Sequence, residues 1–221
     1  MSQTRVVRVR ENILNQNRIE ADVLRKRLAD AGVFMVNLMS SPGSGKTSLI
    51  LKTIEALRSR FRIAVIEADL DSTVDADKMT AVEIPAVQIE TGGFCHVDAT
   101  MTQSAIAQLH ESEIDLLFLE NVGNLICTAQ HDTGAHLNLA ILSVPEGDDK
   151  PLKYPVMFAA ADAVIINKTD FLQLTDFDMQ AVRERIRVLN PEAPVLPLSC
   201  TTGDGFGAWI DWLTAGPLAH G

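Results

Sequence analysis

The stretch SSPGSGKTS, residues 40–48, directly follows the apolar run VFMVNLM (33–39) and leads into a helical pattern, TSLILKTIEALRS (47–59). A glycine-rich loop between a strand and a helix binds phosphate, because its backbone N–H groups and the helix N-terminus face the anion. We expect Lys46 to reach the β- and γ-phosphates of a nucleotide and the Thr47 hydroxyl to bind Mg²⁺. The first glycine of the usual loop pattern is replaced here by Ser40. The residues predicted to surround the phosphates are Pro42, Gly43, Ser44, Gly45, Lys46, Thr47 and Ser48.

Short apolar runs alternate with helical patterns along the rest of the chain. The runs predicted as buried strands are 33–39, 62–67, 86–90, 116–120, 139–144, 163–166 and 195–198, and helical patterns cover 47–59, 99–111 and 178–189. Continuous apolar strands that are separated by helices indicate a mostly parallel sheet covered on both faces. The predicted fold class is therefore α/β, a P-loop NTPase with helices on both faces of a mostly parallel sheet.

The first part of the chain has a different pattern from the strands and helices that follow. Residues 11–30 carry apolar side chains close to helical spacing, and Gly32 stands where such a helix would end. We therefore expect an N-terminal helical segment, residues 1–32, before a nucleotide-binding domain that spans residues 33–221.

The composition excludes several classes of protein. With 19 basic and 29 acidic residues the chain has a net charge of −10, which argues against nucleic-acid binding because phosphate contacts need a basic surface. No apolar run approaches the roughly 18 residues of a membrane span, and the N-terminus does not resemble a secretory signal. Three cysteines do not make a disulfide framework. A cytoplasmic protein with thiols available as ligands is the expectation.

Two loops near the end of the chain predict the choice of base. The sequence NKTD, Asn167 to Asp170, follows a predicted strand and resembles the guanine-reading motif of GTPases. Its aspartate would accept hydrogen bonds from guanine, whereas adenine reverses that donor pattern and would leave polar groups unpaired. Asn167 and Lys168 would brace the loop and cover the ring. The later SCTTGDG (199–205) resembles the next GTPase motif, which places Ser199, Cys200 and Thr201 at the base.

Two acidic residues end predicted strands on the same side of the sheet as the phosphate loop. Asp69 lies just beyond the second predicted strand, in IEADLD, and Glu120 closes LLFLE and is followed by Gly123. Carboxylate oxygens suit Mg²⁺, so both are candidate magnesium ligands, although solvated acids at strand ends are the plain alternative. Lys46, Thr47, Asp69 and Glu120 are the predicted catalytic residues. No glutamine stands in the usual water-positioning place, which predicts a slow intrinsic rate.

The sequence GGFCHVDA sets Cys95 beside His96 after the third predicted strand, and Cys127 follows Glu120 in ENVGNLIC. Both segments leave carboxyl ends of strands, where ligands bind in a parallel sheet. Thiolate and imidazole ligands suit Zn²⁺ or Ni²⁺ far better than Mg²⁺. A structural pair without metal is the alternative on spacing alone. A catalytic cysteine–histidine pair is disfavoured, because adjacent residues rarely face each other as nucleophile and base.

Taken in order, SSPGSGKTS, GGFCHVDA, ENVGNLIC, SVPEGDDKPLKYPVMFAAAD and NKTD resemble the HypB family of hydrogenase nickel incorporation GTPases. The resemblance implies a SIMIBI-class GTPase that dimerises around nucleotide and delivers nickel to the large subunit precursor of [NiFe]-hydrogenase together with HypA. It implies that Cys95, His96 and Cys127 bind nickel or zinc and bridge two subunits. Two features differ from some members: the chain lacks an N-terminal cysteine-rich or histidine-rich motif, and Thr100 replaces a further histidine. The remaining ligand is then Asp98, water or a second subunit.

Two other functions remain open on the sequence. A urease-type nickel accessory GTPase shares the fold class, but ENVGNLIC disfavours it. A zinc-binding regulatory dimer with negligible turnover is the other. A homodimer is expected from the resemblance and from the apolar FLQL (171–174) after the guanine loop, unless Phe171, Leu172 and Leu174 belong to the core.

Overall fold

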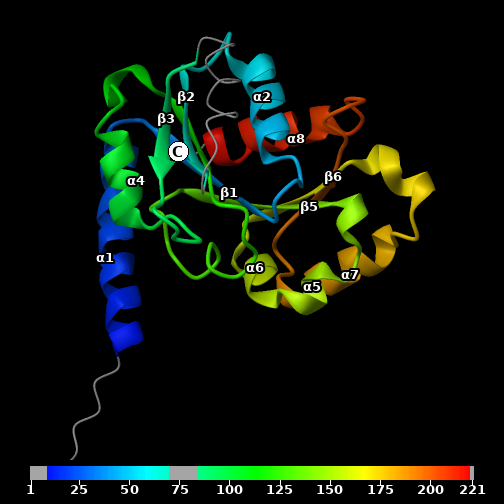
Figure 1. Cartoon of the computed structure of the whole chain (residues 1–221). Coiled ribbons are helices and arrows are strands. Elements are labelled where there is room, and N and C mark those ends of the chain that lie inside the picture. The colour runs from blue at the N-terminus through cyan, green and yellow to red at the C-terminus, as the bar shows by residue number, and fades with distance from the viewer. Residues whose placement is uncertain (1–8, 70–83, 220–221) are drawn as a thin grey trace, which may run out of the picture.

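The computed structural model describes residues 9–69 and 84–219, and its centre is a seven-stranded sheet in the order β3-β2-β4-β1-β5-β6-β7 (Figure 1). The strands are β1 (Phe34–Ser40), β2 (Ile63–Asp69), β3 (Ala86–Glu90), β4 (Leu116–Glu120), β5 (Leu137–Ser143), β6 (Ala163–Asn167) and β7 (Val195–Pro197). Every neighbouring pair is parallel. The seven predicted strands and the α/β fold class are confirmed.

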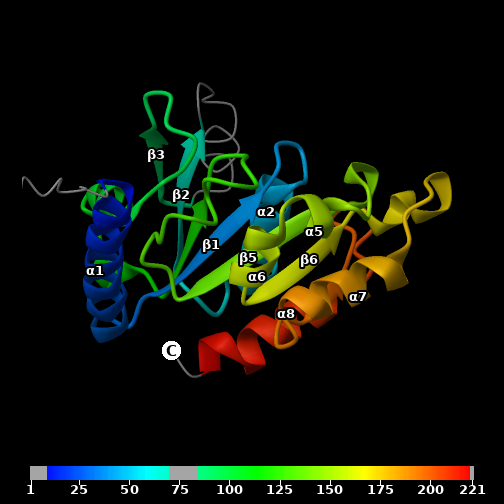
Figure 2. The same cartoon turned by 90° about the horizontal axis from the view of Figure 1, so that it is seen from below.

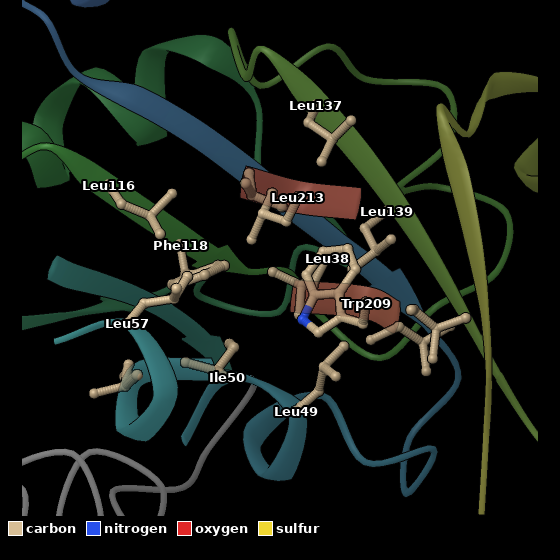
Figure 3. Packing of buried hydrophobic residues seen from close by; sticks show 14 of the residues in the cluster. Leu38, Leu49, Ile50, Leu57, Leu116, Phe118, Leu137, Leu139, Trp209 and Leu213 are labelled. Carbon is tan, nitrogen blue, oxygen red and sulfur yellow. The ribbon is translucent and has the colours of Figure 1, made fainter. Parts of the chain in front are cut away.

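Helices cover both faces of the sheet because successive strand residues point to opposite faces and both sets are apolar. On one face α2 (Lys46–Leu57) and α8 (Phe206–Ala215) pack over β1, β4 and β5 around the buried Trp209 (Figure 3). The Trp209 indole N–H donates to Thr53 Oγ1 at 2.9 Å, so its polar atom is satisfied. On the other face α1 (Val9–Asp30) and α4 (Ala99–Ile106) pack over β2 and β4, while α6 (Pro155–Ala160) and α7 (Met179–Leu189) pack over β5 and β6.

Helix α1 packs against the sheet and lies alongside α4 (Figures 1 and 2). Leu24 and Leu28 are buried in the same apolar cluster as Met35 of β1. Burying two leucines contributes roughly 3–6 kcal/mol before the entropy of ordering the helix is counted. The predicted boundary at residue 32 remains a prediction.

Several helices differ from the sequence prediction in extent. The pattern 99–111 gives a helix only to Ile106, since Gln108 and Leu109 donate to carbonyls three residues back and tighten the last turn. Helix α8 was not predicted, although Phe206, Trp209, Ile210 and Leu213 have helical spacing. Also unpredicted were α5 (Lys150–Lys153), α6 and the short 3₁₀ turns η1 (Glu111–Glu113), η2 (Val144–Glu146), η3 (Thr169–Leu174) and η4 (Pro217–Ala219). None of the helices in residues 9–69 and 84–219 is long and apolar enough to cross a bilayer.

Candidate functional site

The phosphate loop lies between the end of β1 and the start of α2, as the sequence predicts (Figure 1). Gly45 precedes the helix with φ +98°, and a Cβ atom there would lie 2.4 Å from Asn167 Nδ2. Asn167 can therefore approach the loop only because position 45 has no side chain. Its amide donates to the Ser44 carbonyl at 2.9 Å, which joins the phosphate loop to the predicted guanine loop.

Ser40, which departs from the usual glycine, is buried and has a use in the loop. Its hydroxyl donates to the Ser41 carbonyl at 2.7 Å and accepts from Lys46 Nζ at 3.1 Å. The ammonium of Lys46 is thus held above the loop, although only 8% of the residue is exposed. A serine at this position is compatible with a lysine directed at phosphates.

Thr47 and Glu120, the two candidate magnesium ligands from distant parts of the chain, are in direct contact. The Thr47 hydroxyl donates to Glu120 Oε1 at 2.8 Å. Both residues line a cavity of about 420 Å³, together with Pro42, Gly43, Gly45, Lys46, Ser48, Glu67, Ala68, Asn121, Val122, Gly123 and Lys168. Gly123 lets this segment approach the loop, since a Cβ atom there would lie 2.8 Å from Pro42 Cγ.

A second acidic residue, which the sequence analysis did not select, lines the same cavity. Glu67 of β2 is 4% exposed and pairs in register with Glu120 of β4. Asp69, the predicted magnesium ligand of this strand, ends β2; its backbone pairs with Glu90, and its side chain lies outside the described residues. The alternation of IEAD could have indicated Glu67, because residues 67 and 69 point to the same face of a strand.

The two predicted base-reading loops meet each other. Lys168 has φ +59°, and its Nζ donates to the Gly43 carbonyl at 2.6 Å. Ser199 Oγ donates to Asp170 Oδ1 at 2.6 Å and accepts from the backbone N–H of Thr201 at 3.1 Å. The backbone N–H of Cys200 donates to Asn167 Oδ1 at 3.3 Å. Asp170 is therefore held in place before any base binds.

Cys200 belongs to this loop and lies apart from the other two cysteines. Burial raises the pKa of its thiol to about 11, so the thiol stays protonated at neutral pH. A protonated, buried thiol is a poor metal ligand. This placement agrees with the prediction that Cys200 lies at the nucleotide loops and not with Cys95 and Cys127.

The candidate metal residues lie in two neighbouring stretches, which we call the Cys–His segment (residues 91–99) and the Cys127 segment (residues 121–132). In the first, Cys95 Sγ and His96 Nδ1 are 4.0 Å apart. The His96 ring stacks on His131 of the second segment at a centroid distance of 3.5 Å. His131 Nδ1 in turn lies 2.9 Å from the Cys127 carbonyl oxygen. The predicted residues are thus brought to adjoining loops, and His131, which sequence reasoning missed, lies between them.

The described residues do not by themselves form a complete metal site within one chain. Among the described residues, no three Cys, His, Asp or Glu side chains are grouped so that they could hold an ion. Burial lowers the pKa of His96, and the neighbouring His131 lowers it further. The imidazole is consequently neutral at physiological pH, which is the form that binds metal. Thr100, which replaces the histidine of some family members, instead donates to Glu20 of α1 at 2.6 Å.

A buried asparagine connects the nucleotide cavity to the Cys–His segment. Asn121 follows Glu120 and is 0% exposed. Its Oδ1 accepts from the backbone N–H of Val97, next to His96, at 3.2 Å, and its Nδ2 donates to Asn37 Oδ1 at 3.1 Å. Sequence reasoning passed over this residue, because a hydrogen bond to a distant backbone leaves no periodic pattern.

Apolar side chains are exposed at both sites. Phe94 and Ile126 flank the candidate metal residues at 57% and 52% exposure. In the FLQL stretch, Phe171 and Leu174 are also exposed, whereas Leu172 packs against the core. The alternative that all three apolar residues of FLQL are core is therefore wrong for Phe171 and Leu174.

Comparisons with known proteins agree on one family. The model of the CobW/HypB/UreG nucleotide-binding domain matches residues 34–197. The hydrogenase maturation factor HypB of Azotobacter vinelandii is 48% identical over 96% of this chain and 70% of its own length. The hydrogenase/urease maturation factor HypB of Helicobacter hepaticus is 44% identical over 86% of this chain and 79% of its own. The crystal structure of HypB from Helicobacter pylori in complex with nickel superposes with a TM-score of 0.87 at 38% identity, covering 93% of this chain and 96% of that one.

Proposed function

The chain belongs to the HypB hydrogenase maturation factors of the CobW/HypB/UreG family, and from this premise we propose that it is a GTP-hydrolysing nickel metallochaperone for [NiFe]-hydrogenase. The observation that carries the proposal is the Asn121 side chain, which joins the segment after Glu120 to the backbone beside His96. Asn121 lines the nucleotide cavity and accepts a hydrogen bond from Val97, so it links the cavity to the segment that carries Cys95 and His96. Hydrolysis can regulate metal binding only through a coupling free energy between the two sites, and this hydrogen bond is a physical route for it.

The residues around the cavity have separate roles in the hydrolysis of GTP to GDP and phosphate. The backbone of Gly43 to Ser48 binds the phosphates at the N-terminus of α2, and Lys46 neutralises charge that develops on them. Asp170 selects guanine, while Asn167 and Lys168 fix its loop against the phosphate loop.

Thr47 and Glu120, with Asp69 as a further acidic residue, are the residues that would hold Mg²⁺. Their oxygens fit the ion because Thr47 and Glu120 already meet at 2.8 Å inside the cavity. The bound ion would neutralise the phosphate oxygens during transfer. Glu67 adds a second carboxylate to the same wall of the cavity.

For the transported metal we propose that Cys95, His96 and Cys127 bind Ni²⁺ or Zn²⁺. Two ligands of a tetrahedral zinc ion, one sulfur and one nitrogen, are roughly 3.6 Å apart given their bond lengths. The observed 4.0 Å between Cys95 Sγ and His96 Nδ1 is close to that separation. Because one chain does not group three ligands among its described residues, a second copy of the chain is proposed to complete the site.

We propose a homodimer as the active form, with a nickel-delivery partner, HypA, and the hydrogenase large subunit precursor as its further partners in the cytoplasm. The exposed Phe94 and Ile126 support a dimer contact at the metal residues, and Phe171 and Leu174 support one at the nucleotide loops. Apolar side chains gathered on a surface favour association over solvent exposure.

The test is a titration of the purified chain with Ni²⁺ and with Zn²⁺, with GDP and with a non-hydrolysable GTP analogue, while light scattering reports the oligomeric state. Multiple-turnover phosphate release is measured on the same sample. Turnover together with nucleotide-dependent nickel affinity supports the proposal. Metal-dependent dimers without turnover would indicate the zinc-binding regulator. Co-purification with urease and not hydrogenase maturation proteins would indicate the urease-type function.

A further inference from the structure

One side chain of the N-terminal helix bonds to both segments that carry the candidate metal residues. Asn17 Oδ1 accepts from the backbone N–H of Ala99 at 3.0 Å, at the end of the Cys–His segment. Its Nδ2 donates to the backbone carbonyl of Asp132 at 2.9 Å, at the end of the Cys127 segment. A single amide of α1 therefore links the two segments, in addition to the hydrogen bond from Val97 to Asn121 and the stacked rings of His96 and His131.

Neighbouring residues of α1 contact the same two parts of the chain, at or just beyond the ends of these segments. Arg25 forms an ion pair with Asp132 at 2.7 Å and donates through Nε to the Ala135 carbonyl at 2.8 Å. On the other side Glu20 accepts from the Thr100 hydroxyl at 2.6 Å. Among the described side chains of α1, Asn17 bonds to both segments at once.

Apart from its two hydrogen bonds, an asparagine at position 17 is unfavourable for the stability of the helix and of the core. Asparagine is a poorer helix former than alanine. Asn17 is only 7% exposed, so its amide is removed from water and would cost free energy if it were not hydrogen-bonded. Packing alone would be served better by an aliphatic side chain. Its two hydrogen bonds are what the amide contributes.

We propose that Asn17 is a positioning residue for the metal site and that α1 acts as a brace that holds the Cys–His and Cys127 segments in register. The proposal rests on the proposed metal-binding function. Residues that orient metal ligands from outside the ligand shell change affinity by about 10- to 100-fold when they are removed. Asn17 acts on the ligands through the backbone, at Ala99, which follows His96 by three residues, and at Asp132, which follows Cys127 by five.

The substitution Asn17→Asp tests the brace with little change in shape. The carboxylate still accepts from Ala99 but faces the Asp132 carbonyl with an oxygen in place of the N–H, so one link becomes a repulsion. Asn15→Asp is the matched control, because it makes the same change at an exposed position of the same helix. Asn17→Ala removes both links without adding charge and serves if the aspartate variant folds poorly.

The measurements are Zn²⁺ and Ni²⁺ affinity by competition with a chromophoric chelator, the visible spectrum of the Co²⁺-loaded protein, GDP affinity and the thermal midpoint. We expect Asn17→Asp to lose about tenfold or more in metal affinity and to alter the Co²⁺ ligand-field bands, with GDP affinity within twofold of wild type. Asn15→Asp should match wild type in all four.

A merely structural role would lower the thermal midpoint and leave the Co²⁺ spectrum unchanged, and that outcome in both Asn17 variants overturns the proposal. Wild-type metal affinity in both variants overturns it as well. Failure of the metal site itself is recognised separately: Cys95→Ala and Cys127→Ala would then bind metal as the unaltered chain does.

Discussion

The nucleotide loops and the candidate metal segments lie at the same edge of the sheet but are organised differently. The nucleotide loops bond directly to one another: Asn167 to Ser44, Lys168 to Gly43, and Ser199 to Asp170. The metal segments touch through a stacked pair of histidine rings and one hydrogen bond from the Val97 N–H to Asn121, and Asn17 of α1 bonds to both segments from outside. We expect the first site to be preformed and the second to be adjustable.

This difference agrees with what each site must do. A site that binds substrate and stabilises a transition state gains from donors fixed in advance, since no reorganisation is needed during the reaction. A site that must take up and release its cargo gains from two arrangements of similar free energy. Substitutions at the first site should therefore act locally, and substitutions at the second should also respond to distant contacts.

The largest effect is expected for Lys46→Ala, which tests whether the nucleotide site is preformed around this lysine. Removing one electrostatic contact to the transition state typically lowers the rate by about 10²- to 10³-fold. The protein should remain folded. The hydrogen bond from Lys46 to Ser40 lies within the phosphate loop, and Lys46 is not part of the three apolar core clusters. Steady-state phosphate release measures the loss, and Lys26→Ala, in an exposed ion pair on α1, is the control. Wild-type turnover in Lys46→Ala would contradict the assignment of the phosphate loop.

Cys127→Ala tests the other site. Loss of an outer contact to a metal ligand lowers metal affinity by about 10- to 100-fold. Loss of the ligand itself should reduce Ni²⁺ and Zn²⁺ affinity by at least as much. GTP affinity should stay within twofold, since the nucleotide loops are closed by their own bonds. Cys200→Ala is the matched control, because that buried thiol lies beside Lys52 and Asn167 at the nucleotide loops. Unchanged metal affinity in Cys95→Ala and Cys127→Ala would mean that the pair is structural.

Asp170→Asn asks how far the preformed nucleotide site determines the choice of base. The amide cannot accept both guanine hydrogens, and an unsatisfied buried polar group costs about 1–3 kcal/mol. GTP affinity should fall by the corresponding factor while ATP affinity does not, as measured by competition against a fluorescent nucleotide. Asp176→Asn, at an exposed position between η3 and α7, should have no effect. An undiminished preference for GTP in Asp170→Asn would exclude this loop as the base reader.

The same contrast explains what the sequence could predict. Strands such as LLFLE and loops such as SSPGSGKTS and NKTD are contiguous, so their residues predict both the element and its chemistry. Cys95, His96 and Cys127 were selected from their residue types and position after strands. Asn17, Asn121 and His131 act through tertiary contacts to backbone atoms or rings far along the chain. Such contacts have no local pattern, and only the folded chain shows them.

An effect no larger than that of Asp170→Asn is expected from coupling between the sites, and it tests whether they are independent. Because Asn121 joins the Glu120 strand end to Val97, GTP and GDP forms should differ in Ni²⁺ affinity. Coupling of this kind is typically about 1–3 kcal/mol and is reciprocal. Calorimetry should therefore give one factor in two ways. It is the ratio of Ni²⁺ affinities between the GTP and GDP forms, and it is also the change that Ni²⁺ makes in the ratio of GTP affinity to GDP affinity. A factor of one in both directions would make the two sites independent.

The smallest effect is expected when the pH is lowered, and it tests whether α1 or α2 opens first. His136 accepts from the Met35 N–H at 3.0 Å through Nδ1, and its Nε2 lies 3.1 Å from the Arg25 carbonyl of α1. Burial lowers the pKa of His136, so the folded protein holds it neutral. The unfolded chain binds the proton more readily, and stability from this group is present above about pH 6.5 and is lost as the pH falls toward the folded pKa.

Protonation would also remove the acceptor that Met35 uses, and it would do so where α1 meets the sheet. Helix α1 braces the metal segments, whereas α2 at the phosphate loop has no contact with this histidine among those described. Amide hydrogen exchange between about pH 7 and about pH 5.5 should therefore accelerate in α1 before α2, after correction for the intrinsic pH dependence of exchange. His136→Gln, which does not titrate, should reduce that difference, whereas His110→Gln, at an exposed position, should not. If α1 and α2 open together in the unaltered chain, the brace and the nucleotide site form one cooperative unit, and the contrast between a preformed and an adjustable site fails at this point.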